Sequence, residues 1–169
     1  PIRTIVHRRV QSGQAPEVSV ITFTDALGRT IQTRALAEAP GQQVVNGAVE
    51  WNERGLVVKQ WAPYLDTFSE SYRSASLVSG LTSPVSYAYD PLGRVTKTID
   101  PDGSTTEAAY DDWTVTTTDA NGHRIRRTHD GYGRLVTVEE FLDGQTLTTK
   151  YDYGLRATNS TIIQIHNDL

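Results

Sequence analysis

The chain has 169 residues and a formal net charge of −4, with a sequence pI near 5.5, so it has the length for one domain with a core. The mild negative charge argues against a nucleic-acid-binding protein, which usually carries a basic stripe, and no apolar stretch is long enough to cross a membrane. The absence of cysteine excludes disulfides and thiol chemistry and fits a secreted protein. Because the chain also lacks methionine and begins at Pro1, we expect an internal fragment or a processed product.

Residues 1–64 predict an N-terminal array of β-hairpins. Residues 17–36 contain two strand-like runs around an Asp-x-x-Gly turn signal. A second hairpin is predicted around the turn at 52–55, with Trp51 and Trp61 on its paired strands. We interpret both tryptophans as packing residues because aromatic side chains bury a large area; a stacking site for a sugar or a base is the alternative.

Residues 65–84 interrupt this rhythm. They are rich in serine and show no clean period, so they predict a connecting loop between two hairpin arrays. The spacing of Phe68, Tyr72 and Ala75 allows one short helix within the loop.

Residues 85–153 predict a meander of consecutive hairpins. Tyr-Asp or His-Asp begins at positions 89, 110, 129 and 151, and an Asp-Gly or Asn-Gly pair begins at 102, 121 and 143. A period of roughly 20 residues is typical of a repeated supersecondary unit. The runs between the turns are rich in Val, Thr, Ile and Tyr and alternate only softly, which favours a curved sheet wetted on both faces. Residues 154–169 lose the turn frame, and we expect an atypical terminal segment there.

The Asp-x-x-Gly frame explains the turns physically. An Asp or Asn side chain at the first turn position accepts a backbone N–H two residues later, and a glycine at the fourth position adopts the left-handed conformation that closes the hairpin. We therefore predict positive φ at Gly93 and Gly133. The predicted structural turn residues are Asp25, Gly28, Asn52, Gly55, Tyr89, Asp90, Gly93, Arg94, Asp100, Gly103, Asp119, Gly122, Asp130, Gly133 and Arg134.

These motifs resemble the YD-repeat, or Rhs-repeat, family. Its signature, Tyr-Asp-x-x-Gly-Arg followed by Leu or Val, is matched by residues 89–95 and, with histidine in place of tyrosine, by residues 129–135. A second signature, Pro-Asp-Gly followed by threonine, is matched by residues 101–105. Residues 24–30 and 50–64 are similar to the part of this family found in the BC component of bacterial toxin complexes and in SpvB-like proteins.

The resemblance implies an all-β fold in which antiparallel hairpins join edge to edge into a strip of sheet that spirals into a hollow shell. The shell encloses a C-terminal toxic domain, so the chain would be a non-enzymatic wall segment of a secreted or cell-surface bacterial protein. A strip of hairpins has two bare edges, and the expected partners are the rest of a larger repeat chain, or copies of this chain, together with an encapsulated toxin domain. Many members of the family also carry an aspartate-dependent self-cleavage site; the Asp90 and Asp100 frames resemble it locally but lie where turns are needed.

The motifs predict no catalytic residue, metal site or cofactor. His123 and His129 would lie roughly 20 Å apart along a strand, too far to share a metal, and His7 and His166 are isolated in the sequence. The run from Asp100 suggests a calcium loop, but Thr105 and Asp111 occupy the positions at which an EF-hand needs Gly and Glu. The alternative to a shell wall is an adhesive or carbohydrate-binding β-repeat that uses Trp51, Trp61 and Trp113 as stacking platforms.

Overall fold

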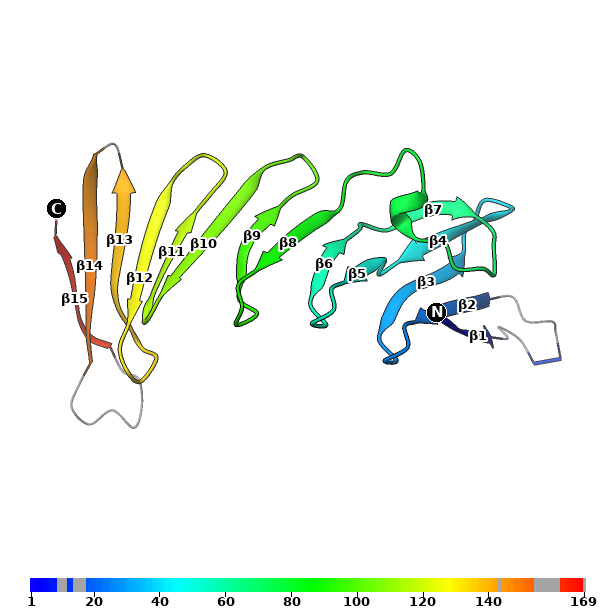
Figure 1. Cartoon of the computed structure of the whole chain (residues 1–169), viewed down its shortest axis with the longest axis horizontal. Helices are drawn as coiled ribbons and strands as arrows, with labels where there is room; N and C mark the ends of the chain where they lie inside the picture. The colour runs from blue at the N-terminus through cyan, green and yellow to red at the C-terminus, as the bar shows by residue number, and fades with distance from the viewer. Residues whose placement is uncertain (9–11, 14–17, 143, 154–161, 169) are drawn as a thin grey trace. The chain divides into compact units, whose positions relative to one another are not determined.

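The structure is a computed structural model that describes residues 1–8, 12–13, 18–142, 144–153 and 162–168. It divides into two compact units, whose strands are labelled in Figure 1. The first unit comprises Pro1–Tyr87 with Asp100–Asp102, and the second comprises Ala88–Ile99 with Gly103–Leu169. Within the described residues, every regular element is a β-strand except one short 3-10 helix, and all strand pairs are antiparallel. The predicted all-β, antiparallel fold is therefore confirmed.

The first unit contains a five-stranded sheet and a separate hairpin. The sheet has the order β1-β2-β3-β4-β7, and the hairpin β5–β6 pairs through β6 with the start of β8. Its elements are β1 (Ile2–Arg8), β2 (Val18–Thr24), β3 (Thr30–Leu36), β4 (Gln42–Asn46), β5 (Val49–Trp51), β6 (Val57–Gln60), β7 (Tyr64–Thr67), the 3-10 helix η1 (Ala75–Leu77) and the first residues of β8 (Val85–Tyr89).

A small hydrophobic core lies within this unit. Val45, Ala48, Trp61 and Ala75 form one buried cluster, and Tyr64 and Leu81 pack against it. On the same face of the sheet, the ring of Phe23 meets the ring of Tyr72 edge to face, with 5.6 Å between their centroids. The segment after β7 therefore covers one face of the five-stranded sheet, and Trp61 has the packing role that the sequence predicted.

The stretch at 65–84 is more ordered than a connecting loop. Its first residues belong to β7, which pairs with β4, and Ala75 at the start of η1 is buried in the core. The short helix expected from the spacing of Phe68, Tyr72 and Ala75 is only the single 3-10 turn of η1. The division at 64, 84 and 153 stays a prediction.

A buried polar network accompanies the core. Arg34 is fully buried, and its Nε donates to Gln32 Oε1 at 3.0 Å while its Nη1 donates to Gln43 Oε1 at 3.4 Å. Its Nη2 lies 3.4 Å from Asp66 Oδ2, which is close enough for an ion pair, although no hydrogen bond satisfies this nitrogen. Asp66 also pairs with Arg73 at 3.3 Å. These polar partners offset the large cost of burying a guanidinium group.

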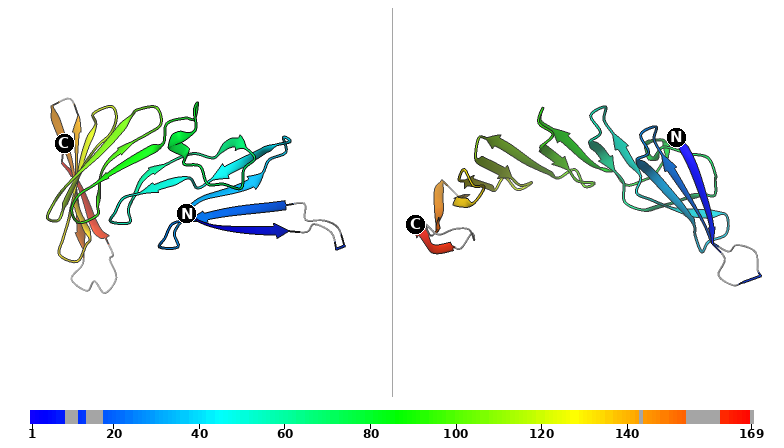
Figure 2. Two further views of the ribbon diagram at one scale, coloured as in Figure 1. Left: turned by 45° about the vertical axis from the view of Figure 1, so that its right-hand side comes forward. Right: turned by 90° about the horizontal axis from the view of Figure 1, so that it is seen from below.

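The second unit is a meander of successive hairpins. Its strands follow the order β9-β10-β11-β12-β13-β14-β15, so each described strand pairs with its neighbours in sequence (Figures 1 and 2). After the end of β8, the elements are β9 (Val95–Ile99), β10 (Thr105–Asp111), β11 (Thr114–Thr118), β12 (Arg124–His129), β13 (Leu135–Leu142), β14 (Gln145–Tyr153) and β15 (Ile162–Asp168). Residues 154–161 and 169 of the predicted atypical terminal segment, and Asp143 of the Asp-Gly series, lie outside the described residues.

No residue of the second unit whose burial is described is fully buried. Cross-strand pairs take the place of a core. Arg126 lies opposite Glu139 and donates two hydrogen bonds to its carboxylate, at 2.6 and 2.5 Å, and Lys97 reaches Glu107 at 3.0 Å. The guanidinium group of Arg124 stacks over Phe141 with 4.1 Å to the ring centroid. Such pairs are the unit of stabilisation in a half-exposed sheet.

Replacing a tryptophan should change the free energy of unfolding by different amounts in the two units. Trp61 is 7% exposed in the core of the first unit, whereas Trp113 is 59% exposed in the turn between β10 and β11. We expect Trp61→Ala to lower the free energy of unfolding by about 3–5 kcal/mol, and Trp113→Ala to change it by less than about 0.5 kcal/mol. Urea denaturation followed by circular dichroism measures both, and equal losses would contradict the assignment of the core.

Candidate functional site

The turn aspartates make the same set of hydrogen bonds in each complete frame. Asp90 Oδ1 accepts the backbone N–H groups of Leu92 and Arg94, both at 2.9 Å. Asp90 Oδ2 accepts Nε of Arg94 at 2.6 Å, and Gly93 N–H donates to the Asp90 carbonyl at 3.0 Å. One carboxylate therefore shapes the turn and holds the cation that follows it.

The other frames repeat or modify this arrangement. Asp25 with Arg29 and Asp130 with Arg134 reproduce it, each with an Nε–Oδ2 distance of 2.7 Å. Asn52 supplies the same two backbone contacts, at 3.0 Å each, but leads to a leucine rather than to a cation. In the frame that begins at Asp100, Ser104 stands at the position that arginine occupies in the complete frames. Gly103 keeps the left-handed turn conformation, with a φ of 86°.

Histidine replaces arginine in one frame. His123 Nδ1 lies 2.9 Å from Asp119 Oδ2, in the position that arginine Nε occupies elsewhere. The Asp119 turn also keeps its backbone contacts to Asn121 and His123, at 2.9 and 2.8 Å. Because a neutral imidazole can still donate through Nδ1, this contact does not require a charged histidine.

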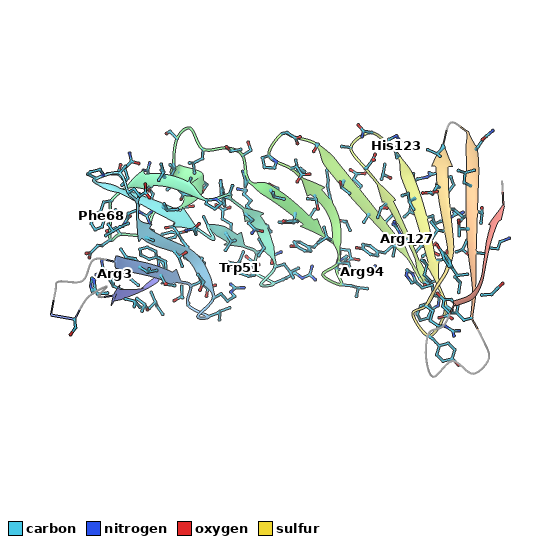
Figure 3. All side chains as sticks on the ribbon, turned by 180° about the vertical axis from the view of Figure 1, so that it is seen from behind. Arg3, Trp51, Phe68, Arg94, His123 and Arg127 are labelled. Carbon is cyan, nitrogen blue, oxygen red and sulfur yellow. The ribbon has the colours of Figure 1, made fainter. Side chains whose placement is uncertain are left out.

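Each arginine of a complete frame also stacks on an aromatic ring from a later strand. The guanidinium carbon of Arg94 lies 4.2 Å from the ring centroid of Tyr110, and Tyr110 Oη donates to the carbonyl of Val95 at 3.0 Å. Arg134 lies 4.6 Å from the ring of Tyr153, whose Oη donates to the Leu135 carbonyl at 2.6 Å. We call this combination of aspartate, arginine and aromatic ring the repeat clasp. It ties a turn to a strand that arrives later in the chain. Arg94, the arginine of one clasp, is labelled in Figure 3.

The repeat clasp in the first unit uses tryptophan. Arg29 stacks over Trp51 at 4.7 Å, but the indole Nε1 is buried without a hydrogen-bond partner. The Asn52 turn lies against the same arginine, because a Cβ atom added at Gly55 would come within 2.9 Å of Arg29 Nη1. Gly55 is therefore required by its φ of 76°, and a side chain at this position would also have to displace the end of the Arg29 side chain.

The sequence located the turns but missed the stacking partners. The sequence did not predict that the arginine of each complete frame stacks on an aromatic ring. The missed contacts are those of Arg29 with Trp51, of Arg94 with Tyr110 and of Arg134 with Tyr153. A signal was present, since Asp is followed by Arg four positions later in three frames. The aromatic partner lies at a spacing that differs between frames, so a fixed-period search could not find it.

The turn carboxyl groups are held in their ionised form. Partial burial works against ionisation of Asp90, but hydrogen bonds from Arg94, together with its charge, hold the pKa of Asp90 below its ordinary value. The pKa values of Asp25 and Asp130 are lowered in the same way by Arg29 and Arg134. For Asp119 the largest cause of the lowered pKa is the hydrogen bond from His123.

The described residues contain no group of three or more His, Cys, Asp or Glu side chains placed to hold a metal ion, and no helix among them is long and apolar enough to span a membrane. Trp51 is half-buried beneath Arg29, Trp61 lies in the core, and Trp113 is exposed. The side chain of His166, in β15, is outside the described residues.

Residues 74–105 match the model of the RHS repeat. This stretch of the chain is similar to an RHS repeat. The resemblance inferred from the Tyr-Asp-x-x-Gly-Arg motif is therefore confirmed, and the matched stretch includes the Asp90 turn. A search of the curated proteins finds no match.

Solved structures share the fold of this chain. The crystal structure of TcdB2-TccC3-Cdc42 matches at 19% identity with a TM-score of 0.73, over 88% of this chain and 9% of that chain. The Photorhabdus luminescens Tc holotoxin pore matches at 18% identity with a TM-score of 0.73, over 96% of this chain and 10% of that chain. At these identities the likeness establishes the fold alone, and the chain spans about a tenth of the length of the toxin-complex chains that it matches.

The turn beginning at Asp130 allows a matched test of the backbone conformation. Gly133 has a φ of 75°, which confirms the predicted left-handed conformation, as does the φ of 85° at Gly93. An added Cβ would meet no atom within 4 Å at either Gly131 or Gly133, but only Gly133 has a positive φ. We expect Gly133→Ala to destabilise the fold by about 1–2 kcal/mol, and Gly131→Ala to be neutral or slightly stabilising. Equal shifts in melting temperature would show that the turn does not require a left-handed residue.

The lowered pKa values predict loss of stability in acid. A carboxyl group whose pKa is lowered on folding stabilises the fold above its unfolded pKa, and this contribution is lost as the pH falls through the folded pKa. The melting temperature should therefore change little between neutral pH and about pH 5 and fall below about pH 4. Thermal unfolding across this range is the measurement.

Asp90→Asn isolates the charged part of this effect. It keeps an oxygen for the two backbone N–H groups and loses the ion pair with Arg94, so the melting temperature should be lower at neutral pH and the loss in acid smaller. Glu53→Gln, at an exposed turn position, is the control and should leave the acid profile unchanged. An unchanged profile in Asp90→Asn would contradict the role assigned to the Asp90 carboxylate.

Proposed function

We propose that the chain is a wall segment of a larger, secreted RHS-repeat shell that encloses a cargo polypeptide. The observation that carries this proposal is the combination of an RHS-repeat match with a fold shared, over most of this chain, with a small part of the TcdB2-TccC3 chains. The function is steric rather than enzymatic. A sheet wall excludes proteases and bulk solvent from whatever lies behind it.

The construction of the second unit supports a wall. Its strands pair in sequence order, and those of its side chains whose burial is described are exposed or half-exposed rather than buried in a core. In repeat architectures of this kind each unit contacts mainly its neighbours, so the array can be extended by adding units. The repeat clasps would fix each turn against the following hairpin, and the turn residues from Asp25 to Arg134 would act as structural residues of the wall.

The native protein that contains this sequence provides the test. We expect it to be a polypeptide much larger than 18.7 kDa, the mass of this chain, with a cargo segment that resists protease until the protein is opened by denaturant. Immunoprecipitation with an antibody against this chain, followed by intact-mass measurement and limited proteolysis, distinguishes the cases. A native polypeptide of the same mass as this chain, or a cargo segment digested equally fast before and after opening, would contradict the proposal.

A carbohydrate-binding role is the second candidate, and the exposure of Trp113 favours it. Trp51 and Trp61 are engaged within the fold, so Trp113 would be the stacking platform. Saturable quenching of tryptophan fluorescence by an oligosaccharide, lost in Trp113→Ala and retained in Trp51→Phe, would favour binding over a wall. Unchanged fluorescence across a glycan panel would remove this candidate.

A further inference from the structure

An apolar row crosses all five strands of the sheet in the first unit. Val6 pairs with Val20, Val20 with Ala35, Ala35 with Val44, and Val44 with Leu65. Directly paired residues project from the same side of a sheet, so the five side chains form one continuous line. We call these residues the apolar row. Its two ends, Val6 and Leu65, are each 58% exposed.

The face that carries the apolar row is uncharged over most of its extent. The next row consists of Thr4, Thr22, Thr33 and Asn46. The charged residues of β3 and β7 and of Ile2–His7 in β1 project from the opposite face of the sheet. They are Arg3, Arg34 and Asp66. An antiparallel sheet with one face in water usually places polar and charged residues on that face. The apolar row departs from this pattern.

Only the opposite face has a cover among the described residues. Phe23, Arg34 and Val45 lie beneath the segment that follows β7, as the contacts to Tyr72 and Ala75 show. Arg3 on that face also reaches Glu70 at 3.1 Å. The end residues of the apolar row, in contrast, are mostly exposed, together with Ile2 at 59%. An open face that carries a continuous apolar line is the kind of surface on which a second layer can pack.

We propose that the apolar row is a self-association surface on which a second copy of this chain stacks the same face. Apart from the register position of Arg8, at the end of β1 and opposite Val18, this face carries no charged residue. It therefore meets itself with little like-charge repulsion and without burying an unpaired charge in its middle, and a strongly acidic or basic partner would find little complementary charge there. A two-fold axis through the middle of the row places valine, alanine and leucine side chains against the same set in the other copy.

The size of the face sets the strength of this association. Five strands spaced about 4.8 Å apart, with a mean length of about six residues, cover roughly 24 Å by 20 Å. Two stacked copies would bury on the order of 1,000 Å², which is at the lower limit for a specific interface. We therefore expect a weak dimer that forms as concentration rises. This association is independent of the proposed shell function, and it uses a sheet face rather than a sheet edge.

Sedimentation velocity of the chain across the micromolar range tests the proposal. The wild-type chain should shift from monomer to dimer, and the double variant Val6→Lys with Leu65→Lys should dimerise at least tenfold more weakly. Both residues are mostly exposed, so the melting temperature should stay close to that of the wild type. Leu27→Lys is the control, since Leu27 is 78% exposed in the turn after β2 and should leave dimerisation unchanged.

A second variant separates face stacking from edge pairing. Val44 lies on β4, between β3 and β7, so it has no part in a sheet edge. Val44→Lys should weaken the dimer as the double variant does, with circular dichroism confirming that the variant is folded. A wild-type chain that stays monomeric at every concentration, or a dimer that forms equally well in the folded lysine variants, would overturn the proposal.

Discussion

The aspartate carboxylate at the first position of each turn is the group on which the repeat depends. In a complete frame it accepts two backbone N–H groups through one oxygen and the arginine Nε through the other. The arginine can then stack on an aromatic ring of a later strand. In the Asp90 frame, the hydroxyl of Tyr110 also donates a hydrogen bond to the carbonyl of Val95, the residue after Arg94. A turn that would otherwise be a local feature thus becomes a link between hairpins. Charge-assisted hydrogen bonds of this kind are among the stronger polar contacts in proteins.

The two units reach stability by different means. The first unit has a buried cluster around Val45 and Trp61 and also accommodates the fully buried Arg34. The second unit has no fully buried residue among those whose burial is described, so backbone ladders, cross-strand pairs such as Arg126 with Glu139, and the repeat clasps must hold it. Interactions distributed in this way let each hairpin depend mainly on its neighbours, which suits an extendable sheet.

The sequence predicted the turns, which depend on adjacent residues, and missed the contacts between residues far apart along the chain. The Asp-x-x-Gly spacing located the turns and the positive φ values of Gly93 and Gly133, because turn chemistry is set by a few adjacent residues. It did not predict the stacking of Arg94 on Tyr110, because that contact depends on strand register. The pairing of β7 with β4 and the burial of Arg34 were missed for the same reason: both depend on residues far away along the chain.

Arginine and tyrosine act together across the repeat clasp, and a double-mutant cycle on Arg94 and Tyr110 measures this directly. Arg94→Gln, Tyr110→Leu and the double variant are compared by equilibrium unfolding. We expect the two single-variant losses in the free energy of unfolding to sum to roughly 0.5–1 kcal/mol more than the loss in the double variant. Either single variant already removes the stacking of the guanidinium group on the ring, so the double variant cannot lose it twice. The same cycle on Arg94 and the exposed Tyr132, which belongs to the frame that begins at Asp130, should be additive. Strict additivity between Arg94 and Tyr110 would contradict this expectation, because it would mean that the two side chains contribute no coupling free energy between the turn and the neighbouring strand.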